Sequence, residues 1–151
     1  MKAEDMGAMA VLGAGSWGTA LADILGRKGF KVRLWARSEE LCGSICETRV
    51  NDAYLPGITL SENIIPCSSL EGALKDAGFI VSAIPSHGLR GVFAFARPFI
   101  RKDAIIVSAT KGIEEGTLLT ASGILKDVLK AAHGGALVAL SGPSFAGEVA
   151  L

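Results

Sequence analysis

Near its start the chain reads Gly13-Ala14-Gly15-Ser16-Trp17-Gly18, a glycine-rich stretch between a short apolar run and a helix-like segment. A turn that joins a strand to the N-terminus of a helix forms a pyrophosphate site, because free backbone N–H groups attract anions there. Gly13 would allow the tight turn, Gly15 would let the phosphates approach the backbone, and Gly18 would let the helix pack closely on the strand. The stretch therefore predicts dinucleotide binding, with an ordinary strand-turn-helix corner as the alternative.

Apolar runs alternate with helix-like segments along the whole chain. This alternation is typical of parallel strands joined by right-handed crossovers, and runs that are apolar throughout indicate strands covered on both faces. We therefore expect an α/β fold of the Rossmann type, doubly wound, with a mainly parallel sheet and helices on both faces. The expected strands are Ala8–Leu12, Lys31–Trp35, Ile64–Cys67, Phe79–Ile84, Ala104–Ser108 and Ala136–Leu140. The expected helices are Thr19–Lys28, Ser38–Glu47, Leu70–Ala77, Ser86–Ala96 and Leu118–Ala132, with a further one beginning in Phe145–Leu151.

Local signals predict where three of these helices begin or end. Gly29 follows the first helix and is expected in the left-handed conformation that closes a helix. Pro98 is expected to end the fourth helix, because proline cannot donate a helical hydrogen bond. Thr117 is expected to cap the N-terminus of the last long helix.

The composition is that of one globular domain, with 50% hydrophobic and 20% charged residues in a chain of 151. Fifteen basic residues balance fifteen acidic ones, so neither nucleic acid nor an anionic membrane is expected as a partner. Apolar runs such as Ala104–Val107 and Ala136–Leu140 are too short to cross a bilayer. Met1–Met6 carries Glu4 and Asp5 and has no apolar signal core, which predicts a cytoplasmic protein.

Three cysteines form no disulfide pattern in the sequence. Cys42 and Cys46 could share one face of a helix, but no histidine lies near them to complete a zinc site. We therefore expect reduced thiols and no metal.

The residues that follow the second expected strand bear on the choice of cofactor. A Rossmann unit usually places an acid there, about twenty residues after the glycine turn, to bind the ribose hydroxyls. This chain has Trp35-Ala36-Arg37-Ser38 instead. A guanidinium can hold a 2′-phosphate bidentately, so Arg37 favours NADP, while a solvated arginine or one stacked on adenine remains the alternative.

The fourth expected strand leads into Pro85, Ser86 and His87. Ligands of open α/β sheets lie outside the carboxyl ends of the strands, so Pro85 and Ser86 are expected to line the cofactor cleft. A proline at the first position of a helix is an equally good reading of Pro85. His87 has no visible partner and fits a surface or capping residue better than a catalytic base.

Two more segments follow strands at the same edge of the sheet. Lys111, in Thr110-Lys111-Gly112, would point into the cofactor cleft, where its ammonium can hold a substrate oxygen or phosphate. Ser141-Gly142-Pro143-Ser144 follows the last strand and leads into a helix whose free donors would face the same cleft.

Together these segments resemble the NAD(P)-dependent glycerol-3-phosphate dehydrogenases. The likeness runs from Val11 to the end of the chain and keeps its motifs in order. The matching stretches are Gly13 to Ala22, Leu34-Trp35-Ala36-Arg37, Asn51 with Tyr54-Leu55-Pro56-Gly57-Ile58, Thr110-Lys111-Gly112 and Ser141-Gly142-Pro143-Ser144-Phe145-Ala146. Members of this family reduce dihydroxyacetone phosphate with NAD(P)H to sn-glycerol 3-phosphate, the backbone of phospholipids.

The resemblance also implies roles for single residues. Ser16 and Trp17 look like turn residues that contact the cofactor, and Arg37 matches the position near the adenine ribose. Lys111 looks like the lysine that touches both cofactor and substrate and takes part in catalysis. The remaining matches are Gly142 and Ser144 for substrate and Ala146 for cofactor.

In one respect the chain departs from the family. Members carry a second, mostly helical domain with the lysine that acts as general acid and with groups that bind the substrate phosphate, and this sequence ends before it. We therefore expect residues 1–151 to be the cofactor-binding domain, inactive alone, with a homo-oligomer as a candidate assembly. A free-standing nucleotide-binding or redox-sensing module is the alternative. A two-domain reductase of hydroxy or keto acids that shares only the glycine turn is disfavoured by the Thr-Lys-Gly and Ser-Gly-Pro segments.

Overall fold

A computed structural model describes residues 7–142 and 144–151. Its centre is a six-stranded sheet in the order β3-β2-β1-β4-β5-β6, in which every neighbouring pair of strands is parallel. The strands are β1 (Ala8–Leu12), β2 (Val32–Trp35), β3 (Ile64–Cys67), β4 (Ala77–Ser82), β5 (Ile105–Ser108) and β6 (Leu137–Ala139). The chain winds outward from β1 to β3, then crosses back to β4, so the order reverses between β1 and β4. This is the Rossmann order, and it leaves a crevice at that switch point.

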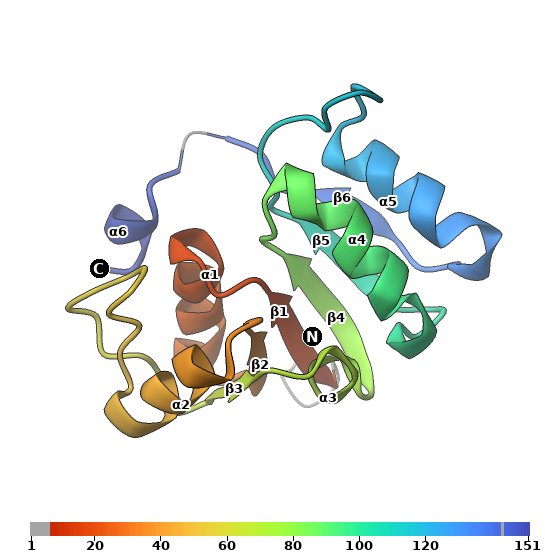
Figure 1. The fold of residues 1–151 in the computed structure, drawn as a ribbon. Coiled ribbons are helices and arrows are strands. Elements are labelled where there is room, and N and C mark those ends of the chain that lie inside the picture. The colour runs from red at the N-terminus through yellow and green to blue at the C-terminus, as the bar shows by residue number, and fades with distance from the viewer. Residues whose placement is uncertain (1–6, 143) are drawn as a thin grey trace.

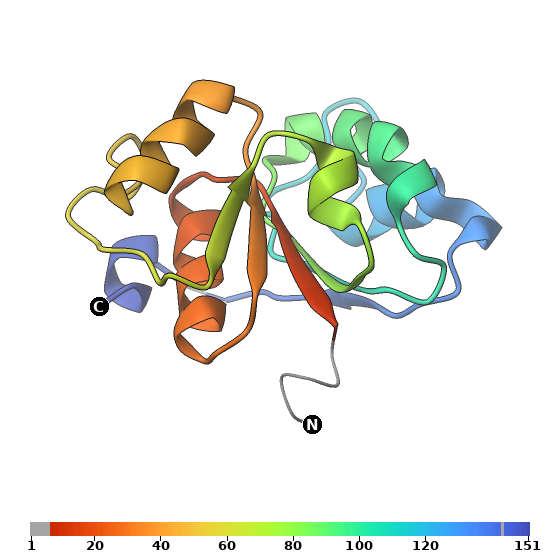
Figure 2. The same ribbon diagram turned by 90° about the horizontal axis from the view of Figure 1, so that it is seen from below.

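Helices cover both faces of the sheet, as Figures 1 and 2 show. The helices are α1 (Ser16–Arg27), α2 (Glu39–Thr48), α3 (Leu70–Leu74), α4 (Ser86–Ala96), α5 (Ala121–Leu129) and α6 (Ala146–Val149), with short 3₁₀ turns at Arg97–Phe99 and Lys130–Ala132. In these views α1, α2 and α6 lie on one side and α3, α4 and α5 on the other. The predicted fold class is therefore confirmed.

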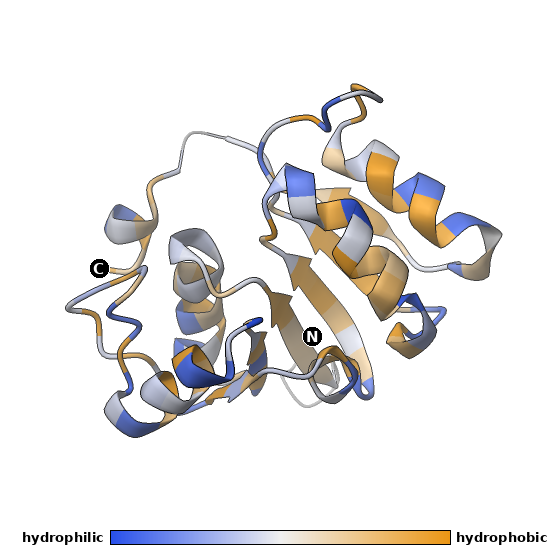
Figure 3. Cartoon of the chain, in the orientation of Figure 1, coloured by the Kyte–Doolittle hydropathy of each residue, from blue (hydrophilic) through white to orange (hydrophobic). Residues whose placement is uncertain are grey.

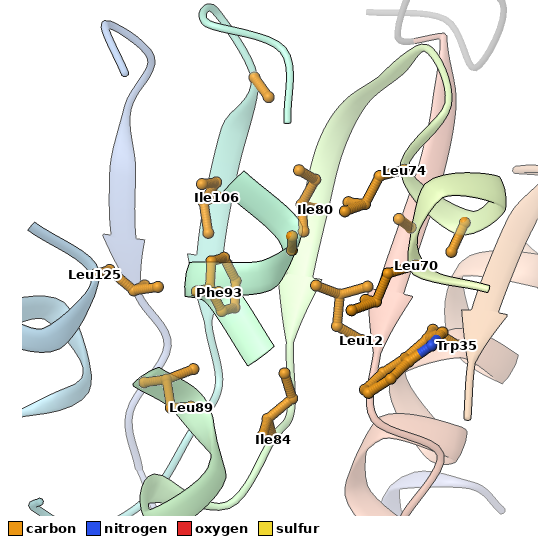
Figure 4. Close-up of a cluster of buried hydrophobic side chains, with 14 of the residues drawn as sticks. Leu12, Trp35, Leu70, Leu74, Ile80, Ile84, Leu89, Phe93, Ile106 and Leu125 are labelled. Carbon is orange, nitrogen blue, oxygen red and sulfur yellow. The ribbon is translucent and has the colours of Figure 1, made fainter. Parts of the chain in front are cut away.

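The central strand β1 divides the core between the two faces. Met9 and Val11 belong to one buried cluster, which includes residues of α1 and α2. Ala10 and Leu12 belong to the other, which includes residues of α3, α4 and α5 and is drawn in Figure 4. Alternate residues of a strand point to opposite faces, so a strand buried on both sides is apolar at every position. Figure 3 shows this as nearly continuous hydrophobic colouring of the inner strands.

Several helix boundaries differ from the prediction. α1 begins at Ser16 rather than Thr19, because Gly15 is already its N-cap in extended conformation. Thr117 is not the N-cap of α5: Thr120 caps the helix, accepting a hydrogen bond from the Gly123 N–H. The Thr117 hydroxyl instead donates to Glu114, which makes it part of the loop before the helix.

The connection between α3 and β4 also differs from the prediction. We expected a helix through Ala77 and a strand from Phe79 to Ile84, but α3 ends at Leu74 and β4 spans Ala77–Ser82. The chain reverses at Asp76, which has a positive φ of 57°. Ala77 then pairs with Ala8 of β1, and this pairing between distant segments overrides the local helical pattern.

The other two helix-end signals, Gly29 and Pro98, behave as expected. Gly29 has a positive φ of 91°, and its N–H bonds to the Gly26 carbonyl just after α1. α4 ends at Ala96, and Pro98 lies in the 3₁₀ turn that follows. Within the described residues, no helix is both long and apolar enough to span a bilayer. The expectation of a cytoplasmic protein depends on Met1–Met6, which lies outside the described residues.

Candidate functional site

The segments after β1, β2, β4, β5 and β6 line two clefts. We call the first the glycine-turn cleft; its volume is about 600 Å³ and its lining includes Gly13, Gly15, Arg37 and Pro85. We call the second the lysine cleft; its volume is about 690 Å³ and its lining includes Trp17, Lys111, Gly142 and Ser144. The structure thus brings most of the predicted site residues to one edge of the sheet.

The three glycines of the turn meet different surroundings. A Cβ at Gly18 would lie 1.8 Å from the Gly13 carbonyl oxygen, so α1 can approach the turn only with glycine there. Gly13 has a φ of 108°, and a Cβ on it would lie 2.9 Å from the Ala83 carbonyl oxygen. A Cβ at Gly15 would meet no atom within 4 Å. Packing inside the protein therefore requires Gly13 and Gly18, whereas Gly15 leaves open space toward the cleft.

The N-terminus of α1 opens at this turn. Gly15 is the N-cap and offers no side-chain hydrogen bond to the helix. The first turn of a helix has N–H groups with no helical partner, and with the helix dipole they favour an anion. Ser16, the first residue of α1, is exposed. The turn thus presents donors and positive potential where a pyrophosphate would lie.

Arg37 and Pro85 face this cleft from two sides of the switch point. Arg37 follows β2 and is exposed, and the next residue, Ser38, caps α2 by accepting from the Leu41 N–H. Pro85 is the N-cap of α4 with a φ of −55° and does not occupy the first helical position considered above. His87 is exposed on α4 and is not among the residues that line either cleft.

Lys111 joins three of the predicted segments in the lysine cleft. Its Nζ donates to the Ser144 carbonyl oxygen at 3.1 Å and lies 5.7 Å from the centroid of the Trp17 ring. An ammonium at this distance from an indole is attracted by the π face. The side chain is exposed, so its charge is available to a ligand. Among the described residues that line this cleft, Lys111 is the single ionisable one.

Ala146 lies elsewhere. It begins α6 and packs with Ala20, Leu55 and Ala150 in a small cluster on α1. It is not among the residues that line either cleft in the described part of the chain. Trp17, another predicted cofactor contact, packs against the same cluster.

Sequence reasoning missed the contacts that hold the loop carrying Lys111. At one end, the Thr110 hydroxyl donates to the Ile84 carbonyl at 2.8 Å. At the other end, the Arg90 guanidinium of α4 binds Glu114 bidentately, with both N–O distances at 2.9 Å. Both ends of the loop are therefore tied to the segment that runs from β4 into α4.

We call the ion pair between Arg90 and Glu114 the clasp; each partner shifts the pKa of the other. The Arg90 guanidinium, followed by the Thr117 hydroxyl, lowers the pKa of Glu114 to about 2. Arg90 also bonds to Asp127 of α5 at 2.5 Å, and the two carboxylates raise its pKa. Glu114 and Arg90 are far apart in the sequence, and neither carries a motif signal. The one available signal was that Glu114 follows Lys111 by three residues.

Thiols and metal ligands add nothing to the clefts. Cys42 is buried, and burial raises the pKa of its thiol. Cys46 is exposed and Cys67 is intermediate, and all three are free. Across the described residues, no group of three or more His, Cys, Asp or Glu side chains is placed to hold a metal ion.

The fold and the glycine turn define a Rossmann-type nucleotide-binding domain. Residues 8–151 match the family model described as the N-terminus of NAD-dependent glycerol-3-phosphate dehydrogenase, and the chain belongs to this family.

Curated relatives carry the name glycerol-3-phosphate dehydrogenase (NAD(P)+). The protein from Syntrophobacter fumaroxidans is 49% identical over 144 residues, which are 95% of this chain and 42% of the relative. The protein from Citrifermentans bemidjiense is 47% identical over 143 residues, 95% of this chain and 43% of the relative. The chain thus spans about two fifths of the length of these relatives.

Solved structures agree with this assignment. Glycerol-3-phosphate dehydrogenase of Coxiella burnetii superposes with a TM-score of 0.86 at 35% identity, over 95% of this chain and 43% of that one. The enzyme of Saccharomyces cerevisiae superposes with a TM-score of 0.81 at 30% identity, over 95% and 44% of the two chains. The family uses NAD or NADP as its cofactor.

Proposed function

We propose that this chain binds NADP or NAD with the pyrophosphate on the glycine turn and the adenosine in the glycine-turn cleft. The observation that carries the proposal is the contrast among the three glycines. Gly13 and Gly18 are required by internal contacts, whereas the position of Gly15 faces open space at the N-terminus of α1. A turn built in this way fits a group that approaches the backbone closely, as a pyrophosphate does.

The neighbouring side chains indicate which end of the cofactor would lie in which cleft. Arg37 lines the cleft at the end of β2, where it would bind the adenosine 2′-phosphate of NADP. Pro85 lines the same cleft from the end of β4, Ser16 is exposed at the start of α1, and Trp17 lines the lysine cleft. The nicotinamide end would then lie near Lys111, and Ala146 packs against the same small cluster as Trp17.

We further propose that the chain supplies the cofactor half of an enzyme that interconverts dihydroxyacetone phosphate and sn-glycerol 3-phosphate for phospholipid synthesis. When bound, the nicotinamide supplies or accepts the hydride. The Lys111 ammonium would stabilise negative charge on the substrate oxygen, and Gly142 and Ser144 would hold the substrate beside it. A separate helical domain would supply the main proton donor and the substrate-phosphate site, because Lys111 is the single ionisable group among the described residues of the lysine cleft.

The proposal extends to partners and location. The substrate is a small molecule, and a formal net charge of zero gives no attraction to nucleic acid. Three free cysteines fit a reducing cytoplasm. Exposed apolar residues on β6 and after it, Val138, Leu140 and Phe145, are suited to contact another domain or a second copy of the chain.

Binding is tested by titrating the chain with NADPH and with NADH while following tryptophan fluorescence. Trp17 and Trp35 line the two clefts, so occupancy should quench the emission. We expect saturable quenching by both cofactors, with NADPH bound more tightly. Absence of saturable binding by either one would contradict the proposal.

The reaction is tested in a chimera in which this chain replaces the matching part of the Syntrophobacter fumaroxidans relative. We expect the chimera to oxidise NADPH with dihydroxyacetone phosphate, and the chain alone to show no turnover. Lys111→Ala in the chimera should reduce kcat strongly and leave Tm nearly unchanged, because the side chain is exposed. A chimera that binds NADPH but does not reduce dihydroxyacetone phosphate would favour a binding or sensing module.

A further inference from the structure

The segment between α2 and β3 passes beside α1 before it enters β3 (Figure 1). Its Asn51 is fully buried. The Asn51 Nδ2 donates to the Ala14 carbonyl at 3.0 Å and to the Thr19 hydroxyl at 2.8 Å. Ala14 precedes Gly15 and Thr19 follows Gly18, so one amide group bonds to both ends of the turn.

These bonds set the orientation of the turn. The described peptide bonds are all trans, and in a trans peptide the C=O and the following N–H point in opposite directions. Since the Ala14 carbonyl points at Asn51, the Gly15 N–H points away from it. The Thr19 bond fixes the first turn of α1 against the same side chain, so the free donors of that turn keep one direction.

The Asn51 amide is only partly satisfied by its own hydrogen bonds. Its Oδ1 is buried and has no hydrogen-bond partner among the described residues. A buried polar atom without a partner destabilises the folded state. An apolar side chain of the same shape would avoid that loss, but it would leave the buried Ala14 carbonyl and Thr19 hydroxyl without this donor. The amide therefore holds both ends of the turn while one of its own polar atoms stays without a partner.

We propose that Asn51 is a positioning residue that presets the glycine turn to receive the pyrophosphate of the cofactor. The proposal rests on the function proposed above and concerns the diphosphate part of the ligand alone. It also assigns a role to the Asn51–Ile58 stretch, which was noted in the sequence only for its family likeness. A preset turn binds an anion without first reordering its backbone, which strengthens binding.

The test is Asn51→Leu, which keeps the shape of the side chain and removes the donor without adding charge. Asn63→Leu is the matched control: the Asn63 Nδ2 also donates to a carbonyl of α1, that of Gly26 at 2.9 Å, at the far end of the helix. Each variant is titrated with NADPH and with 2′-AMP, which contains the adenosine phosphate but no pyrophosphate. Thermal unfolding is recorded for both.

We expect Asn51→Leu to raise the Kd for NADPH about tenfold, because the pyrophosphate would then bind a turn that must first reorder, and to leave the Kd for 2′-AMP within about twofold. Asn63→Leu should leave both values unchanged. A lower Tm for both variants with an unchanged ratio of the two Kd values would overturn the proposal. If the wild-type chain does not bind NADPH, the proposed function fails; if it binds and Asn51→Leu binds equally well, only this inference fails.

Should Asn51→Leu not fold, Thr19→Val serves in its place, since it removes one of the two bonds and keeps the Ala14 contact. A rise of about threefold in the Kd for NADPH, with 2′-AMP unchanged, supports the proposal. No change in that Kd overturns it.

Discussion

The glycine-turn cleft and the lysine cleft lie at the same edge of the sheet, but they are held in different ways. The glycine turn follows β1, which is buried along nearly its whole length, and internal contacts at Gly13 and Gly18 exclude a side chain. The lysine cleft lies beside β6, whose Val138 is 46% exposed, and Lys111 itself is exposed. Tight packing and the buried Asn51 amide therefore hold the first site, whereas polar contacts of exposed loops and helices hold the second.

This difference has a functional meaning. A pyrophosphate is the same in NAD and NADP, so a rigid cradle serves both cofactors. Under the proposed function the other cleft must admit and release a substrate, and Lys111 lies there on an exposed loop. The clasp of Arg90 and Glu114 ties this loop to α4 without burying it.

The largest expected effect comes from breaking the packed site. Gly18→Ala places a Cβ 1.8 Å from the Gly13 carbonyl oxygen, which must move. We expect at least about 3 kcal/mol of destabilisation, the upper end of ordinary overpacking, and loss of NADPH binding. Urea denaturation measures the first and the fluorescence titration the second. Gly91→Ala, at an exposed position of α4 with open space, should instead stabilise the chain by about 0.5–1 kcal/mol.

The second largest expected effect concerns the charge of Arg37, which lines the glycine-turn cleft where we propose that the adenosine binds. Arg37→Asp replaces attraction by repulsion beside a 2′-phosphate. We expect binding of NADPH to weaken by about 1.5–3 kcal/mol, or about ten- to a hundredfold, with little change for NADH. The ratio of the two dissociation constants is the measurement. Equal weakening of both cofactors would show that Arg37 stacks on adenine or supports the fold.

A smaller effect separates binding from folding within the glycine turn. Gly15→Ala meets no protein atom within 4 Å, and the φ of −72° at Gly15 suits alanine. The free energy of unfolding should change by less than about 1 kcal/mol, the cost of a poorer N-cap. The new methyl group would occupy space next to the pyrophosphate, so NADPH and NADH should both bind about tenfold more weakly. If stability falls as far as in Gly18→Ala, the distinction between the two glycines is wrong.

The smallest expected effect concerns the clasp of the lysine loop. The pKa of Glu114 is about 2 in the folded chain, against 4.5 for a free glutamate. As pH falls from about 4.5 to about 2, the unfolded chain takes up the proton first, so this stabilisation is complete at neutral pH and is lost in that interval. Glu114→Gln should therefore show a smaller fall in Tm between pH 7 and pH 3 than the wild type. Glu115→Gln removes a charge from the same loop without touching Arg90, and a matching change there would contradict the assignment.

Local patterns in the sequence were sufficient for the architecture. Ser86–Ala96 was predicted as a helix and is observed with the same bounds, because its apolar spacing and the proline before it are local signals. The Thr117 cap was wrong because a local hydrogen bond to Glu114 engages its hydroxyl, and the helix through Ala77 was wrong because pairing with a distant strand decided where it ends. The Thr117 hydroxyl bonds to Glu114, and Ala77 pairs with β1.

The sequence by itself determined the class of fold, the glycine turn after β1 and the positions of Arg37 and Lys111 at strand ends. These depend on residues that are neighbours in the chain, where periodicity and backbone freedom act directly. Only the tertiary structure decided that Asn51 holds Ala14, that Arg90 clasps Glu114 and that Lys111 lies near Trp17. Each of these contacts joins residues separated by a crossover or a long loop, and their meeting depends on how whole helices pack on the sheet.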